Sequence, residues 1–189
     1  MARSHARLQF GMWRTGLGGL TPNSKLLYCV LLTEPTLNHC GVGAMRVSRW
    51  SKDAALTMEE TEKSLTELED GGWIFTDEDT EEVFVRTLIR NDGVVDQPYV
   101  LKGALREAIL TASPSIRKAL AVELRKLPPR KPDGEGKGGR KVTYPDPHAT
   151  ADVLDPLPPG SKATRKAPET LLQGAEKPLE SPLGGGGGG

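Results

Sequence analysis

The chain has 189 residues, of which 37% are hydrophobic, and this suits one ordinary domain with a tail or two very small domains. Its 25 basic and 25 acidic residues cancel, which excludes a polycation that coats nucleic acid without selectivity. Two cysteines, Cys29 and Cys40, are too few for a disulfide scaffold or a four-cysteine zinc site. The longest apolar run, Leu26 to Leu32, is too short for a membrane span, and no signal peptide is recognisable. We therefore expect a soluble, cytoplasmic-type protein without a membrane partner.

The composition changes abruptly after Leu127. Of the 62 residues from 128 to 189, 11 are proline and 12 are glycine, and the last six are all glycine. Such a segment buries too little apolar surface to offset the entropy lost when its backbone is ordered. The sequence predicts a folded domain over 1–127 and a disordered tail over 128–189.

The first expected elements are a strand, a helix and a second strand. Leu8 to Trp13 alternates apolar and polar residues, which predicts a brief strand. Thr21 before Pro22 is a typical helix start, and the apolar residues that follow predict a core helix ending before Pro35. Val42 to Met45 predicts a short strand.

Two helices separated by a tight turn are expected next. Apolar residues three and four apart predict a short helix from about Ser48 to Ala55, with one face formed by Val47, Trp50 and Ala54. Thr57 and Glu60 match a capping box at the start of a second helix, and Gly71-Gly72 predicts its end. The predicted buried stripe of this second helix consists of Met58, Thr61, Leu65 and Leu68.

The remaining elements are a hairpin and two more helices. The runs 73–76 and 82–86 are rich in aromatic and β-branched residues and flank a polar turn, which predicts a β-hairpin. Gln97-Pro98 opens a helix through about Thr111, and Ser113-Pro114 precedes another from Ile116 to Leu127. We expect a mainly α fold with a small β-hairpin, namely a winged helix-turn-helix with two C-terminal helices and a disordered tail.

Several stretches resemble a known family: Leu20 to Tyr28, Glu34-Pro-Thr, Gly41-Val-Gly, Leu65 to Ile74, and Val83-Phe-Val-Arg with Asn91-Asp-Gly. Over about residues 3 to 127 the chain is similar to small winged helix-turn-helix proteins of phages that infect actinobacteria. More distantly, it resembles the N-terminal domain of phage replisome organisers. The resemblance implies binding to double-stranded DNA in replication initiation or transcriptional control, within the host cell cytoplasm if the protein is phage-encoded. Its motifs are mostly structural, so the fold transfers better than the function.

The predicted recognition helix and wing have the wrong charge for DNA. From 58 to 82 there are eleven acids and one base, Lys63, whereas 1–57 carries a net +5 and 83–127 a net +4. A groove-inserted helix with this many carboxylates would be repelled by the phosphate backbone. Most of the candidate DNA-binding residues are therefore basic side chains on the flanks, expected on phosphates: Arg3, Arg7, Arg46, Arg49, Lys52, Arg86 and Arg90. Three further candidates, expected near the nucleobases, are Lys63, Ser64 and Thr66. The added helices offer a further possible basic surface, formed by Lys102, Arg106, Arg117 and Lys118.

Two interpretations remain open at this point. In the first, the protein binds DNA through its basic flanks. In the second, it is an adaptor whose acidic helix and wing recruit a basic protein, such as a helicase or loader, without touching DNA. A homodimer is a further alternative, because the predicted stripe formed by Leu101, Leu105, Ala108 and Ile109 would either complete the core or pair two subunits.

Catalysis, a cofactor and a metal are not expected. No Ser-His-Asp, Cys-His or paired-carboxylate arrangement stands out. The glycine-rich stretches 16–19 and 134–139 lack the strand and helix that flank a phosphate-binding loop. His39 and Cys40 are adjacent, but no second Cys-His pair lies at metal-finger spacing.

Overall fold

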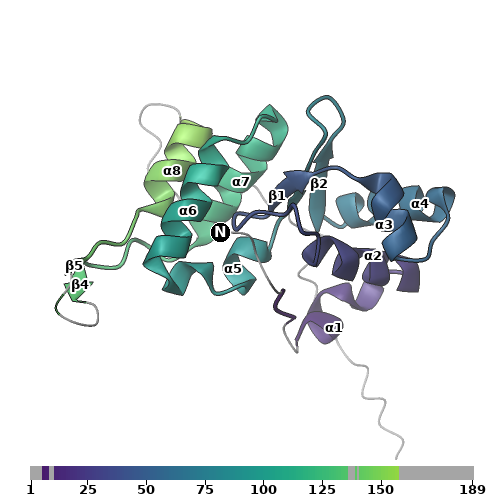
Figure 1. Cartoon of the computed structure of the whole chain (residues 1–189), viewed down its shortest axis with the longest axis horizontal. Coiled ribbons are helices and arrows are strands. Elements are labelled where there is room, and N and C mark those ends of the chain that lie inside the picture. Colours follow the sequence, from purple (N-terminus) through teal and green to yellow (C-terminus); the bar gives the residue numbers. More distant parts are fainter. Residues whose placement is uncertain (1–5, 9–10, 136–138, 140, 158–189) are drawn as a thin grey trace, which may run out of the picture.

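The computed structural model describes residues 6–8, 11–135, 139 and 141–157. We call residues 12–85 the winged-helix region and residues 88–154 the helical region (Figure 1). The winged-helix region consists of α1 (Met12–Thr15), η1 (Leu17–Gly19), α2 (Pro22–Leu32), β1 (Val42–Ala44), α3 (Val47–Asp53), α4 (Met58–Asp70), β2 (Ile74–Asp77) and β3 (Glu82–Val85). The helical region consists of α5 (Leu88–Asn91), η2 (Val94–Asp96), α6 (Pro98–Ile109), α7 (Pro114–Lys126), β4 (Gly134–Glu135), β5 (Lys141–Val142) and α8 (Pro147–Leu154).

The order of α2, β1, α3, α4 and the hairpin, together with the strand pairing, is that of a winged helix-turn-helix. The strands form an antiparallel sheet in the order β1-β3-β2, with Val42 opposite Phe84 and Asp77 opposite Glu82. The predicted hairpin and the predicted short strand from Val42 are thus confirmed. Figure 1 shows the hairpin standing between the two groups of helices.

Capping side chains fix where α2 and α4 begin, as the sequence predicts. The hydroxyl of Thr21 accepts from the Ser24 amide at 3.4 Å at the start of α2. At the start of α4, Glu60 N–H donates to the Thr57 hydroxyl at 3.2 Å and the Glu60 carboxylate accepts from Thr57 N–H at 2.8 Å. Gly72 (φ +64°) then provides the left-handed backbone that ends α4.

The sheet is a middle layer between two hydrophobic cores. Because side chains alternate along a strand, Val83 and Val85 of β3 face the core beneath the winged-helix region, whereas Phe84 faces the other core. The first core includes Trp50, Leu68 and Ile74, and Tyr28 packs edge-on against Trp73 with centroids 5.5 Å apart. The second core is formed mainly by α6, α7 and α8.

The predicted strand over Leu8 to Trp13 is wrong where the structure describes it. Residues 9–10 lie outside the described part, Leu8 is not in a strand, and Met12 begins α1. The alternation covered too few residues to determine a strand. Instead, the short turns of α1 and η1 place Met12 and Leu17 against the core of the winged-helix region.

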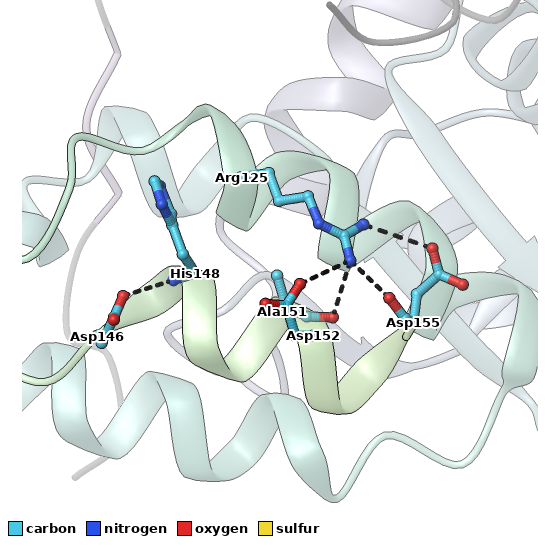
Figure 2. A network of polar contacts seen from close by, with 6 residues as sticks. All are labelled: Arg125, Asp146, His148, Ala151, Asp152 and Asp155. Atoms are coloured by element: carbon cyan, nitrogen blue, oxygen red, sulfur yellow. Dashed lines mark hydrogen bonds and ion pairs between the residues drawn. The ribbon is translucent and has the colours of Figure 1, made fainter. Parts of the chain in front are cut away.

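The predicted disordered tail is wrong for residues 147–154, which form α8 and pack against α7. Pro147, Ala151 and Leu154 are buried, and the latter two belong to the second core. Arg125 of α7 binds the C-terminal end of α8, with Nη2 3.1 Å from Asp152 Oδ1 and Nη1 3.4 Å from Asp155 Oδ2 (Figure 2). The folded part therefore extends beyond 127, while residues 158–189 of the predicted tail lie outside the described part.

Candidate nucleic-acid interface

Three of the candidate DNA-binding residues lie close together in sequence, at the N-cap of α3 and within this helix. The buried side of this helix carries Trp50, whose indole Nε1–H donates to the Glu34 carboxylate at 2.8 Å. This buried bond fixes the rotation of α3, so that Arg49 and Lys52, one position before and two positions after Trp50, face solvent. The three bases, all exposed, are Arg46, Arg49 and Lys52, and we call them the α3 edge.

The charge of the α3 edge is only partly compensated locally. Arg49 Nε lies 3.5 Å from Asp53 Oδ2, and both side chains are more than half exposed. Exposed pairs of this kind contribute little free energy, so the guanidinium can exchange its carboxylate for a phosphate at low cost. The side chains of Arg46 and Lys52 make no hydrogen bond or ion pair with the part of the chain that the structure describes, although the charge of Arg46 contributes to lowering the pKa of Glu34.

On α4, two of the three candidate residues are exposed and one is not. Ser64 is only 3% exposed, so its predicted position near a base is wrong. Its hydroxyl lies on the buried side of α4, as do Thr61, Leu65 and Leu68. Thr66 is exposed, and Lys63 is also exposed but lies 2.7 Å from the Glu59 carboxylate of the same helix.

Arg86 and Arg90, predicted to contact DNA, instead compensate a buried carboxylate. Arg86 is 8% exposed, and its Nε lies 3.4 Å from Glu123 Oε1. Arg90 Nε lies 3.0 Å from Glu123 Oε2, and Lys126 Nζ lies 2.9 Å from Oε1. Because Glu123 is completely buried, these cations are needed to offset its desolvation. Arg86 is not available to a phosphate.

Arg7, the candidate base of the N-terminal arm that the structure describes, does not extend the α3 edge. Arg3 lies outside the described residues. Arg7 lines a cavity of about 190 Å³ beside Tyr28, Trp73 and Thr87, and no residue of α3 is among those that line it. The guanidinium of Arg7 also passes so close to Gly93 (φ +71°) that a Cβ there would meet Nη1 at 2.3 Å.

Several carboxylates of the acidic stretch are engaged inside the fold, which sequence reasoning missed. Glu67 accepts from Thr21 N–H at 2.9 Å and from the hydroxyls of Thr21 and Ser24, at the N-terminal end of α2. Although burial acts to raise the pKa of Glu67, these hydrogen bonds outweigh it and hold that pKa below its ordinary value. The partial positive charge of the helix terminus stabilises the same carboxylate.

The hairpin is attached to the helical region in a similar way. Glu82 accepts from Ala112 N–H at 3.1 Å and from Ser113 N–H at 2.7 Å, at the N-terminal end of α7. Asp77 accepts from the Ser113 hydroxyl, and this bond is the main cause that lowers the pKa of Asp77. These contacts join residues more than 30 apart in sequence, so no local pattern indicated them.

The other carboxylates remain on the outside and form what we call the acidic surface. It extends from α4 to the hairpin turn, and Glu69 joins the two parts by accepting from Thr76 N–H at 2.9 Å. The members of the acidic surface are Glu59, Glu62, Glu69, Asp70, Glu78 and Asp79. A polyanion approaching α4 along this surface is repelled, whereas one approaching the α3 edge meets bases.

The bases of the added helices do not join the α3 edge. Lys102 and Arg106 of α6 and Lys118 of α7 are exposed, but in Figure 1 these helices lie in the half of the molecule opposite α3. Arg117 donates to the Ile109 carbonyl at 3.0 Å and so stabilises the C-terminal end of α6. The predicted pairing stripe is largely internal, since Leu101, Leu105 and Ala108 are buried in the second core; Ile109 is 42% exposed.

Within the described ranges, no three His, Cys, Asp or Glu side chains gather as a metal site requires. Among the same residues, no helix combines the length and the apolar character that crossing a bilayer demands. Comparison of the chain with protein-family models, with curated proteins and with solved structures gives no match in any of the three.

Proposed function

We propose that this protein binds double-stranded DNA through the α3 edge. In a helix-turn-helix, the helix before the recognition helix crosses the phosphate backbone, and its basic side chains contact phosphates. The observation that carries the proposal is that three bases are exposed within seven positions, namely Arg46 at the N-cap of this helix and Arg49 and Lys52 within it. Arginine and lysine in this position suit phosphate contacts that do not depend on base sequence.

The acidic surface limits how the duplex is bound. Glu60 and Glu67 lie at helix N-termini, where the macrodipole offsets part of their charge, and Lys63 offsets Glu59. The carboxylates at the C-terminal end of α4 and in the hairpin turn have no such compensation. We therefore propose a backbone-dominated contact in which the duplex approaches the α3 edge and stays away from the acidic surface on α4 and in the hairpin turn.

This docking mode predicts how strongly the affinity for DNA depends on salt concentration. Each neutralised phosphate contributes about −0.9 to the slope of log K against log salt concentration, so three contacts give a slope of about −3. Fluorescence anisotropy of a labelled random duplex, titrated between low and moderate salt, measures this slope directly. A wild-type protein that does not bind at low salt, or whose affinity is independent of salt, contradicts the proposal.

The critical variant combines Arg46→Gln, Arg49→Gln and Lys52→Gln. All three side chains point to solvent, so the variant is expected to fold, to lose most duplex binding and to lose most of the salt slope. Lys118→Gln is the matched control, because Lys118 is an exposed base on α7 outside the α3 edge. Equal losses in the triple variant and the control would contradict a specific role for α3.

A second candidate function is that of a protein adaptor, and the acidic surface is the observation that favours it. A basic protein segment would be attracted to Glu62, Asp70 and Glu78 without competition from nearby free bases. A lysine-rich peptide titrated against wild type and against a Glu62→Gln, Asp70→Asn, Glu78→Gln variant tests this candidate. Duplex binding through the α3 edge together with no binding of the peptide would exclude it.

A further inference from the structure

Helix α6 and its C-cap residue present a stripe of exposed side chains. Its buried side, with Leu101, Ala104, Leu105 and Ala108, is fixed in the second core. The residues opposite lie three or four positions apart along one side of the helix, and Gly103 among them leaves open space. The α6 stripe consists of Tyr99, Lys102, Arg106 and Leu110.

The composition of the α6 stripe is that of a protein-binding surface. Tyr99 is 75% exposed and Leu110 is 79% exposed, although both are large apolar-bodied side chains. Between them, the side chains of Lys102 and Arg106 are exposed and make no hydrogen bond or ion pair with any described residue. Tyrosine and arginine are enriched among the residues that dominate interface energies, and two cations select an acidic partner.

The acidic surface of the same chain is the complementary surface. On α4 it extends from Glu59 to Asp70, and on α6 the stripe extends from Tyr99 to Leu110. Each pair is separated by eleven positions, so both stripes are about 16 Å long at the rise of an α-helix. Met58, 43% exposed beside Glu59, adds an apolar contact at one end of the acidic stripe.

The two surfaces cannot meet within one molecule. Figure 1 shows α4 and α6 in opposite halves, with the sheet between them. The sheet and both cores hold this arrangement, since β3 contributes to each core. A contact between the stripes therefore requires two copies of the chain.

We propose that the protein self-associates head to tail, with the α6 stripe of one copy on the acidic surface of the next. Because the two surfaces differ, the interface is heterologous and each added copy offers a new free surface. Two short helical stripes bury less area than a standard stable interface of about 1,600 Å², so the association is weak and reversible. It weakens with added salt, because exposed charges provide much of the complementarity. The inference does not depend on the DNA-binding proposal, since neither surface includes the α3 edge.

The test uses two charge-reversal variants of the full chain, alone and mixed, in sedimentation experiments at high protein concentration and low salt. Lys102→Glu with Arg106→Glu disables the α6 stripe, and Glu62→Lys with Asp70→Lys disables the acidic surface. Wild type is expected to form species larger than a dimer, and each variant alone is expected to associate more than about tenfold more weakly. In an equimolar mixture the two intact surfaces pair, and the two reversed surfaces again carry opposite charges, so the mixture is expected to associate more strongly than either variant alone.

The mixture also controls for folding, because the two variants associate with each other only if both keep their folded surfaces. Lys118→Glu, a reversal outside both surfaces, is expected to associate like wild type. A monomeric wild type, a variant that self-associates normally, or a mixture that stays monomeric overturns the proposal. So does a Lys102→Glu, Arg106→Glu variant that loses duplex binding but keeps wild-type self-association, since α6 would then bind phosphate.

Discussion

The winged-helix region and the helical region use ionised side chains in different ways. In the winged-helix region, Glu60 and Glu67 near the surface accept from N–H groups at helix starts, and the buried Glu34 accepts from the indole N–H of Trp50. In the helical region, Glu123 is fully buried, and its charge is compensated by three cations, of which Arg86 and Lys126 lie near Oε1 and Arg90 lies near Oε2. A carboxylate that keeps contact with water contributes a modest local bond, whereas an enclosed one becomes a point on which the packing of several elements depends.

The largest effect is expected for Glu123→Gln. Removing the charge leaves Arg86 buried without a counterion, and breaking a buried pair in this way costs about 3–5 kcal/mol. Urea denaturation measures the loss in the free energy of unfolding. Glu62→Gln on exposed α4 is the control and is expected to stay within about 0.5 kcal/mol of wild type. Equal stability of the two variants would show that the buried network is not important.

A comparable but somewhat smaller effect is expected for Leu154→Ala in α8. Leu154 is buried in the second core, and removing a buried leucine side chain costs about 2–5 kcal/mol. Its neighbour Val153 is exposed, so Val153→Ala is the matched control and should change stability little. Thermal unfolding of both variants checks whether α8 belongs to the cooperative unit. If the Leu154→Ala variant were as stable as wild type, the cooperatively folded domain would end after Leu127, as the sequence predicted.

The smallest effect concerns acid stability and Glu67. Its pKa is lower in the folded protein than the ordinary value of 4.5, so its stabilising contribution is complete above that value. The contribution is lost as the pH falls through the folded-state pKa. Urea midpoints of wild type and Glu67→Gln, measured from pH 7 to pH 3, are therefore expected to converge on the acid side. A difference independent of pH would assign the effect to packing.

Local signals predicted the winged-helix region well because its helix ends are encoded in adjacent residues. The capping box of Thr57 and Glu60 and the start at Thr21-Pro22 both appear in the structure as the sequence predicts. Helix α8 carries a similar signal, since Asp146 caps it and Pro147 opens it. The proline and glycine content was counted over all 62 residues of the predicted tail, and this average concealed the local helix start. The wrong prediction of disorder for α8 therefore came from treating 128–189 as one segment.

The candidate site was only partly predictable, because exposure depends on contacts between distant elements. The apolar spacing of α3 correctly indicated which side of that helix faces solvent. By contrast, Arg86 and Arg90 form ion pairs with Glu123, which lies more than 30 positions away in sequence. The spacing of apolar residues along the sequence does not indicate such a contact. Net charge was misleading for the same reason, since it counts engaged and free carboxylates alike.

The anchoring of the hairpin to α7 has a mechanical consequence. Lifting the hairpin away would break the bonds that Glu82 accepts from two consecutive amides and would leave the first turn of α7 without its acceptors. The wing is therefore stiff before any ligand arrives. A molecule that docks against it pays little ordering entropy, and any force that displaces the wing is transmitted to the far half of the protein.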